Sequence, residues 1–600
     1  MIEGRKIIIQ AVIIIIATTF LVKLFAIQVM NENYKLAAQN NIVQRITEYP
    51  YRGLIYDRDG KYLVVNEPIY DVMIVPMEVS KIDTTLFCEI FSIDKKTFID
   101  NYKKAKEYSI IKPSVFLKMI SNEEFASIQD RLIEFEGFYV RARSVRRYPH
   151  TCLANALGYV GEISKSQLEK DTTGYYQQGD YIGISGIELR YENDLRGVPG
   201  ARYKMVNVQG IEKGDFRDGR LDTLSRPGAS LVSTIDLELQ QYAEKLLAGK
   251  AGSLVAIEPS TGEILSIVSS PSYDPNLLTG RKYSSNFMEI QSDTLVPLFN
   301  RPIMAMYPPG SMFKTVQALI AMQEKVLHAE ELIYCDGSLI GDLAPIGTYD
   351  VRDAITFSSN NYFFKVFRRI INQGKAESPY IDARIGLENW RKYINAFGLG
   401  VQLDIDIPNA KSGLIPTVSY YDRYYGENRW KFSNIYSLSI GQGEVLVTPL
   451  QMANLAAIIA NKGYFYHPHM IREIGINGQP QEKYLEKNYV GIDTVHFRPV
   501  IDGMEEVIRS GSGRRAYLTD IAICGKTSTA ENPHGEDHSG FMAFAPKEDS
   551  KIAIAVYVEN AGWGGRAAAS IGSLVMEKYL RGEITRPWLE EFVLRGEFIY

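Results

Sequence analysis

Two residues three positions apart could form an activated nucleophile in this 600-residue chain. In the segment 307–315 (YPPGSMFKT), the Pro-Pro-Gly stretch breaks regular structure, and an apolar helix is expected to begin at Ser311. Residues three apart on a helix are neighbours on one face, so Ser311 and Lys314 are expected to lie side by side. A neutral lysine there can take the serine proton, and burial or a nearby cation favours the neutral form. Because S-x-x-K also occurs by chance on surface helices, the pair needs support from other motifs.

Two further motifs supply the remaining groups. Ser358 to Asn360 (SSN) precedes an apolar stretch, and Lys526 to Thr529 (KTST) follows an expected strand over 521–524. A second serine can relay a proton to a leaving amine, and a second lysine with threonine hydroxyls can hold a substrate carboxylate. Each motif alone has a structural explanation, namely a helix-start serine, a turn or a solvated strand. In this order they fit the S-x-x-K, S-x-N, K-T-G set of serine acyltransferases.

The chain resembles the class B penicillin-binding proteins, the monofunctional transpeptidases of bacterial cell-wall synthesis, over nearly its whole length. The resemblance extends to RGLIYDRDG at 52–60, GISGIE at 183–188 and GQG at 441–443. Among the subfamilies it is most similar to the penicillin-binding protein 2 group, the elongation enzymes, with GYVGEI at 158–163 as one pointer. The resemblance implies a D,D-transpeptidase that crosslinks peptidoglycan stem peptides ending in D-Ala-D-Ala through a serine acyl-enzyme, and that β-lactams acylate.

The resemblance also implies a role for each catalytic residue. Ser311 is the expected acylated nucleophile, and Lys314 is its general base. Ser358 and Asn360 are expected to help proton transfer and substrate positioning, and Lys526 completes the catalytic set. After D-Ala leaves, an amine from a neighbouring stem resolves the acyl-enzyme into a crosslink.

The third motif supplies the expected substrate strand, with Thr527, Ser528 and Thr529 as substrate-binding residues. The backbone N–H groups of Ser311 and Thr529 are the implied oxyanion hole. This motif normally reads Lys-Thr-Gly or Lys-Ser-Gly, and here Ser528 occupies the glycine position. Glycine lets a backbone or a ligand approach closely, so a serine side chain can crowd the cleft or shift the strand, unless it is compensated elsewhere.

No cofactor and no metal are expected. Some relatives carry a cysteine inside the second motif, where it helps to bind zinc, and this chain has Ser359 there. Cys335 and the aspartates Asp336, Asp342 and Asp350 have no recognisable ligand spacing. The four cysteines lie far apart without a C-x-x-C pair, which excludes both a zinc ribbon and a disulfide scaffold.

The helix and strand patterns of the segments around these motifs predict an α+β fold. Residues 253–271 and 540–560 each read as two strands around a turn, and helical stretches, among them 450–460, lie between them. With a closing helix around 571–580, this indicates a transpeptidase domain over 228–600 whose antiparallel sheet is flanked by helices. Residues 30–227 read as irregular α and β pieces, which predicts an elongated α/β pedestal (dimerisation-type) domain without chemistry of its own. Here the strand-rich stretch 61–76 is expected to break at residues 66–68, and Ser121 and Glu124 are expected to form a capping box before a helix. The arginines within 138–149 are expected to form a solvated strand face or a binding stripe.

The segment from Ile7 to Val29 is almost continuously apolar and predicts a single transmembrane anchor. Its length of about 34 Å as a helix exceeds the hydrocarbon core of roughly 30 Å. Arg5 and Lys6 favour a cytoplasmic tail over residues 1–6. The rest is then expected to be periplasmic, on the bacterial inner membrane. A buried core helix and a cleavable signal peptide are the alternatives, and no small-residue cleavage site follows Val29.

Composition and charge narrow the partners. With 46% hydrophobic and 23% charged residues the chain is not disordered, and a net charge of −5 leaves no basic footprint for nucleic acid.

By resemblance, the anchor and pedestal are expected to bind a polytopic SEDS-type glycosyltransferase and a rod-complex scaffold protein. The competing interpretations are a β-lactamase, a β-lactam sensor, and a catalytically weak scaffold that activates a partner glycosyltransferase, for which Ser528 is the only support.

Overall fold

The computed structural model describes residues 2–25, 43–206 and 212–599. The chain forms two compact units. The smaller comprises residues 1–52, 68–145 and 196–228, and the larger comprises residues 53–67, 146–195 and 229–600. The larger unit thus includes two stretches that precede residue 228, and the expected domain boundaries at 30 and 228 stay predictions.

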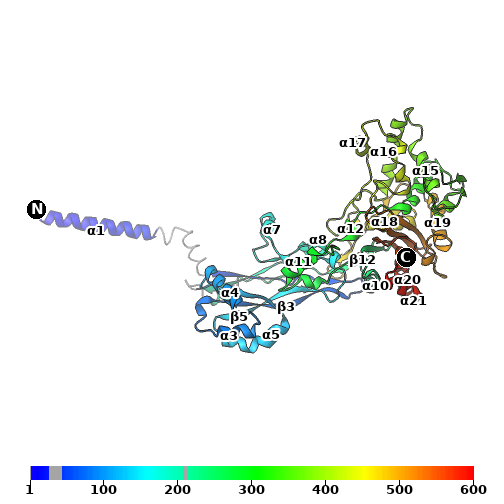
Figure 1. Cartoon of the computed structure of the whole chain (residues 1–600). Coiled ribbons are helices and arrows are strands. Elements are labelled where there is room, and N and C mark those ends of the chain that lie inside the picture. Colours follow the sequence, from blue (N-terminus) through cyan, green and yellow to red (C-terminus); the bar gives the residue numbers. More distant parts are fainter. Residues whose placement is uncertain (1, 26–42, 207–211, 600) are drawn as a thin grey trace. The chain divides into compact units, whose positions relative to one another are not determined.

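A five-stranded antiparallel sheet forms the centre of the larger unit, in the order β12-β11-β20-β19-β18. Its strands are β11 (Gly252–Ile257), β12 (Ile264–Ser270), β18 (Cys524–Ala530), β19 (His538–Ala545) and β20 (Ile552–Val558). Helix α18 (Pro449–Ala460) covers one face, and α10 (Leu237–Leu247) and α20 (Ala568–Arg581) cover the other (Figure 1). Because helices cover both faces, β11, β12 and β20 are buried at every position. The predicted strand pairs, the helix at 450–460 and the closing helix are confirmed.

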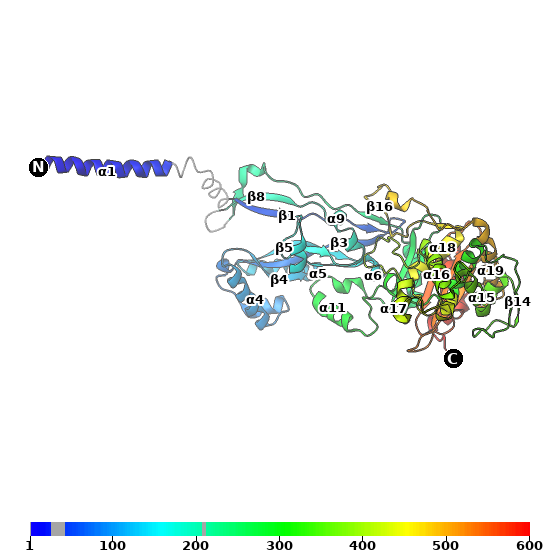
Figure 2. The same ribbon diagram turned by 90° about the horizontal axis from the view of Figure 1, so that it is seen from above.

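The other helices of the larger unit are α6 (Ala154–Leu157), α7 (Lys165–Lys170), α8 (Gly186–Arg190), α9 (Glu192–Leu195), α11 (Tyr283–Ser292), α12 (Arg301–Met304), α13 (Lys314–Gln323), α14 (Val351–Thr356), α15 (Asn360–Ile371), α16 (Pro379–Ala396), α17 (Val418–Tyr425), α19 (Phe497–Arg509) and α21 (Pro587–Arg595). Among them, α15, α16 and α19 lie around this sheet, whereas α9 and α11 lie away from it (Figure 2). Its short strands are β2 (Ile55–Tyr56), β6 (Val160–Glu162), β7 (Tyr181–Gly183), β10 (Leu231–Ser233), β13 (Ile333–Cys335), β14 (Gly347–Tyr349), β15 (Tyr464–Phe465), β16 (Ile471–Ile474) and β17 (Asn488–Tyr489).

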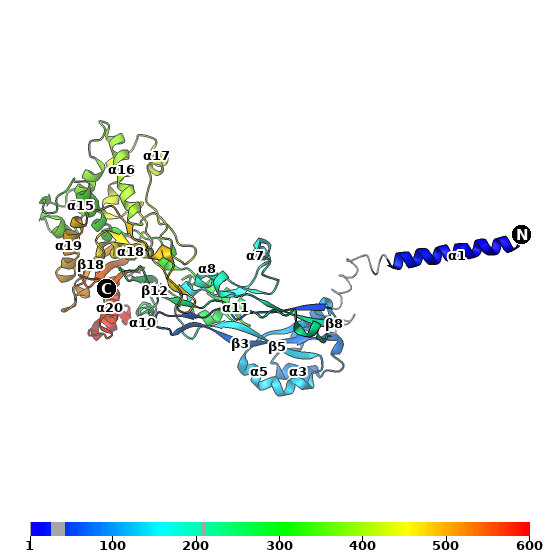
Figure 3. The same cartoon turned by 180° about the vertical axis from the view of Figure 1, so that it is seen from behind.

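The smaller unit has a phenylalanine-rich core of its own. Phe87 lies at its centre, with ring centroids 5.2 Å from Phe98, 5.4 Å from Phe116 and 4.8 Å from Phe138. These rings come from α3 (Thr84–Ile90), α4 (Lys95–Tyr108), β4 (Ser114–Ile120) and β5 (Phe138–Arg147), near α5 (Asn122–Ile128) (Figure 3). A separate antiparallel sheet joins β1 (Val43–Glu48), β8 (Gly200–Val206) and β9 (Glu212–Asp215). The capping box predicted before α5 is confirmed.

Two expectations for the pedestal sequence change in the structure. The break expected at residues 66–68 is wrong, because β3 runs without interruption over Tyr62–Ile74. Its pairing with β2 ends at Val64 and its pairing with β4 begins at Tyr70. Pro68 lies between the two, so its missing N–H leaves neither of these ladders without a donor. The arginines of β5 form ion pairs: Arg143 lies 3.1 Å from the fully buried carboxylate of Asp71. Arg141 and Arg143 therefore neutralise the buried charge of Asp71, and Arg146 neutralises that of Glu188, whereas the exposed Arg147 pairs with the exposed Glu67.

The N-terminal helix α1 spans Ile2–Phe25. Within the described ranges, it is the one helix long and apolar enough to cross a membrane, over Lys6–Phe25. Its side chains are exposed from Lys6 onward, which fits a lipid-facing anchor and does not fit a core helix. Residues 26–29 of the expected span lie outside the described residues.

Candidate active site

Ser311 lies in the turn that precedes an α-helix, whereas the sequence predicted that the helix begins at Ser311 itself. It belongs to the short 3-10 helix η6 (Gly310–Phe313), and the α-helix α13 begins only at Lys314. A 3-10 turn holds three residues, so Ser311 and Lys314 still share one face. Gly310 makes the turn possible: its φ is +52°, and its N–H donates to the Gly441 carbonyl at 2.9 Å.

Lys314 is a fully buried amine directed at the second motif. Its Nζ donates to the Ser358 carbonyl at 2.6 Å, to Asn360 Oδ1 at 2.6 Å and to Ser358 Oγ at 3.2 Å. Burial lowers the pKa of Lys314 well below its ordinary value, and the charge of Lys526 lowers it further, while Asp342 opposes the shift. The environment therefore favours the neutral amine, which is the form that can accept a proton.

Lys526 approaches the same serine from the sheet. It lies on β18, its side chain is fully buried, and its Nζ donates to Ser358 Oγ at 2.9 Å. Burial lowers the pKa of Lys526 to about 7. The Ser358 hydroxyl thus accepts a hydrogen bond from each lysine, and its backbone is held in the left-handed region at φ +57°. All three motifs meet at this one hydroxyl.

Asp342 holds the second motif in place. Its Oδ2 accepts the Ser359 hydroxyl at 2.7 Å and the Asn361 N–H at 2.8 Å, while Asn360 Nδ2 donates to the Gly341 carbonyl at 2.6 Å. Burial acts to raise the pKa of Asp342, but these hydrogen bonds lower it below its ordinary value. Asp342 was considered in the sequence only as a metal ligand. No spacing rule connects a loop residue to a motif seventeen positions later.

The third motif lies inside β18, so the strand expected to end before it is wrong. Thr527 Oγ1 shares a hydrogen bond with Ser512 Oγ, and Thr529 Oγ1 accepts the Gly564 N–H at 3.3 Å. The Ser528 side chain is buried, and its hydroxyl donates to the Pro309 carbonyl at 2.8 Å. Ser512 was missed in the sequence because it belongs to a Ser-Gly run with no recognised motif.

The described part of the chain contains no ligand set typical of a metal site. No three His, Cys, Asp or Glu side chains form a metal-holding group there, and the four cysteines are free. Ser359, in the position where some relatives carry a cysteine, donates to Asp342. The absence of a metal and of a cofactor stays a prediction.

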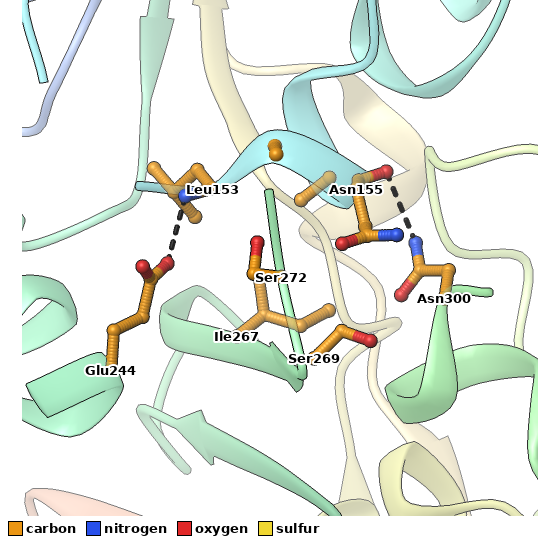
Figure 4. Close-up of a pocket in the computed structure, with 9 residues that line it drawn as sticks. Leu153, Asn155, Glu244, Ile267, Ser269, Ser272 and Asn300 are labelled. Carbon is orange, nitrogen blue, oxygen red and sulfur yellow. Dashed lines mark hydrogen bonds between the residues drawn. The ribbon is translucent and has the colours of Figure 1, made fainter. Parts of the chain in front are cut away.

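A small polar cavity lies elsewhere in the larger unit (Figure 4). Glu244 Oε1 accepts the Leu153 N–H there at 2.8 Å, and Asn300 Nδ2 donates to the Asn155 carbonyl at 3.2 Å. The cavity is also lined by Ser269 of β12, the edge strand opposite β18. It is therefore separate from the Lys314–Lys526 cluster.

Comparisons with known proteins agree with this geometry. Residues 252–577 match the penicillin-binding protein transpeptidase domain, and residues 47–232 match the penicillin-binding protein dimerisation domain. The chain is 30% identical to the peptidoglycan D,D-transpeptidase MrdA of Acinetobacter baumannii over 574 residues, which cover 90% of this chain and 81% of the relative. It is also 30% identical to MrdA of Haemophilus influenzae over 624 residues, which cover 97% and 92% of the two chains.

Solved structures show the same fold. The penicillin-binding protein PBP2 of Helicobacter pylori, solved in complex with MreC, has a TM-score of 0.75 at 24% identity, covering 91% of this chain and all of that one. Pseudomonas aeruginosa PBP2, solved in complex with WCK 5153, has a TM-score of 0.64 at 26% identity, covering 90% and 97% of the two chains.

The sheet, its flanking helices and the two matched domains define the class as that of the penicillin-binding transpeptidases. Within that class, the chain belongs to the class B penicillin-binding protein 2 (MrdA) family of peptidoglycan D,D-transpeptidases, which act in cell-wall elongation. The family resemblance, the α+β fold class and the transpeptidase function predicted from the sequence are confirmed, and the scaffold alternative is not favoured.

Proposed function

We propose that this transpeptidase works through a serine acyl-enzyme formed on Ser311, and that water in place of the acceptor amine makes it a D-Ala-D-Ala carboxypeptidase. One observation carries the proposal: two buried lysines from different motifs donate to the single hydroxyl of Ser358. Two ammonium charges are costly to bury side by side, so at least one amine is neutral at neutral pH. A neutral lysine one turn from a serine is the base that such a nucleophile needs.

The acylation step follows from these contacts. Ser311 Oγ attacks the carbonyl carbon of the penultimate D-Ala, and Lys314 Nζ takes the hydroxyl proton. The N–H groups of Ser311 and Thr529 stabilise the oxyanion. The proton then passes from Lys314 through Ser358 Oγ to the leaving nitrogen, the C–N bond breaks, and D-Ala departs.

Deacylation reverses this proton path. The acceptor amine attacks the ester carbonyl, gives its proton through Ser358 to Lys314, and the C–O bond to Ser311 breaks with return of the proton to Oγ. Lys526 keeps the relay hydroxyl oriented. The strand residues Thr527 to Thr529 and Lys526 hold the stem peptide and its carboxylate.

Intact mass measurement tests the nucleophile. The full chain in detergent is incubated with benzylpenicillin, and wild type is expected to gain the mass of one molecule of the drug. Ser311→Ala is expected to gain nothing, with an unchanged melting temperature, because alanine keeps the helix propensity high. A wild type without an adduct would promote the scaffold interpretation, and an alanine variant with the same adduct would reassign the nucleophile.

We further propose a single-pass inner-membrane topology with residues 1–6 in the cytoplasm, a crossing over residues 7–29 and a periplasmic pedestal and catalytic domain. The exposed apolar helix α1 and the basic pair Arg5 and Lys6 support this orientation. A reporter fused to the C-terminus, active only in an oxidising compartment, is expected to be active. Activity of a cytoplasm-only reporter at the same position would reverse the topology.

The partner proposal concerns the anchor and the pedestal, residues 30–227. We propose that they bind a polytopic SEDS-type glycosyltransferase and a rod-complex scaffold protein. The similar Helicobacter pylori protein was solved with MreC, and a chain with a TM-score of 0.69 at 24% identity comes from a peptidoglycan synthase complex, with 97% and 99% of the two chains covered. Replacing the pedestal should abolish co-purification with both partners, whereas Ser311→Ala should keep it. Unchanged co-purification after the pedestal swap would refute the proposal.

A further inference from the structure

Ser528 occupies the third position of a motif in which the family has glycine, and its side chain is turned away from solvent. It is 2% exposed, and its hydroxyl donates to the carbonyl of Pro309 at 2.8 Å. Pro309 is two residues before Ser311, in the turn that begins η6. The serine therefore contacts the turn that carries the nucleophile.

This hydrogen bond fixes one end of a peptide plane. In the peptide group between Pro309 and Gly310, the carbonyl accepts from Ser528, and the N–H donates to the Gly441 carbonyl at 2.9 Å. A peptide unit is planar, so hydrogen bonds at both ends fix its rotation. The next N–H along the chain belongs to Ser311.

Glycines lie close to Ser528 on neighbouring parts of the chain. A Cβ on Gly310 would lie 2.3 Å from Ser528 Oγ, and a Cβ on Gly540, its partner on β19, would lie 3.3 Å from Ser528 Cβ. A Cβ on Gly564 would lie 2.1 Å from the Ser528 carbonyl. The absence of a Cβ at Gly310 and Gly540 thus leaves the space that the Ser528 side chain occupies, whereas Gly564 leaves space for the Ser528 backbone carbonyl.

We propose that Ser528 is a positioning residue that orients the turn before Ser311 relative to β18. Thr529 follows Ser528 directly, and Ser311 follows the Pro309–Gly310 peptide, so one hydrogen bond connects the two halves of the oxyanion hole. The inference rests on the proposed function, because it assumes acylation of Ser311. In this proposal the Ser528 side chain contacts the turn and not the substrate, so Ser528 holds the stem peptide through its backbone alone.

Stopped-flow acylation by a fluorescent penicillin tests the inference on the full chain in detergent, because it separates the acylation rate constant from the dissociation constant of the first complex. Ser528→Ala keeps the Cβ and removes the donor, and Ser528→Gly restores the family motif. Both are expected to slow acylation by about tenfold to a hundredfold, the range for a slightly misplaced reacting group, with a dissociation constant changed less than twofold.

The matched control is Ser266→Ala, which removes another buried serine hydroxyl in the same sheet, bonded to Gln240 Oε1 at 2.8 Å. It is expected to lower the melting temperature without slowing acylation. An acylation rate constant for Ser528→Gly equal to or above that of wild type would overturn the inference, as would a lower melting temperature for both variants with unchanged acylation. If wild type gains no adduct at all, the proposed function fails instead, so the two failures are distinguishable.

Discussion

Replacing Ser358 by alanine tests the relay at the centre of the site. The native backbone at this position has φ +57°, and alanine keeps the same Cβ, so the substitution removes only the hydroxyl. Lys314 keeps its two shortest contacts, to the residue 358 carbonyl and to Asn360 Oδ1, both at 2.6 Å. Lys526 keeps only its contact with the Thr527 carbonyl at 3.4 Å. The base therefore stays in place while the path to the leaving nitrogen is lost.

The contacts that remain set the expected loss of acylation rate and of stability in Ser358→Ala. A positioned proton-transfer group contributes about 10²- to 10⁴-fold, so acylation should slow at least a hundredfold. The buried Lys526 amine loses its best acceptor, which should cost about 1 to 3 kcal/mol in the free energy of unfolding. The protein should remain folded, with a moderately lower melting temperature.

The assay is the acylation rate constant from stopped-flow fluorescence, together with intact mass to count adducts. Ser253→Ala, which removes a buried hydroxyl on β11, is the control and should acylate like wild type. If Ser358→Ala acylates within threefold of wild type, the hydroxyl does not relay the proton, and a water molecule or the amine itself must do so.

Four further predictions follow from substitutions of three charged groups near Ser358, namely Lys314, Lys526 and Asp342. Lys314→Met should abolish acylation, because a neutral serine hydroxyl is a poor nucleophile without a base, and intact mass should show no adduct. Lys526→Met should move the acid limb of the acylation pH profile upward, since the charge of Lys526 lowers the pKa of Lys314. The same variant should flatten the pH dependence of stability, because burial lowers the pKa of Lys526 from 10.5 to about 7. Between those values only the unfolded chain binds this proton, so Lys526 alone contributes about 1.4 kcal/mol of added stability for each unit by which the pH rises. Thermal melts at pH 7, 8 and 9 measure this slope, and an unchanged slope in the variant would contradict the assignment. Asp342→Asn should slow acylation about tenfold and lower the melting temperature. Asp336→Asn, in the same loop, should change neither the acylation rate constant nor the melting temperature.

Part of the candidate site could be predicted from the sequence because it depends on residues that are close together in the chain. The spacing of Ser311 and Lys314 places them on one helical face whether the turn is 3-10 or α, so the pair survived an error in where the helix begins. Strand pairs around a turn, such as β11 with β12, are also encoded by nearby residues. The break expected at Pro68 was wrong because Pro68 falls between the residues of β3 that pair with β2 and those that pair with β4, a relation that only the folded sheet shows.

Residue types, their order and short-range spacing thus determined the family and the long apolar helix, and they led to the proposal of Ser311 as nucleophile and Lys314 as its base. Only the tertiary structure decided that Lys526 reaches Ser358 across 168 positions of sequence, and that both lysines are fully buried. It also decided the direction of the Ser528 side chain and the role of Asp342. A pKa, a side-chain direction and a long-range hydrogen bond depend on which distant groups surround a residue. Those neighbours exist only once the chain has packed.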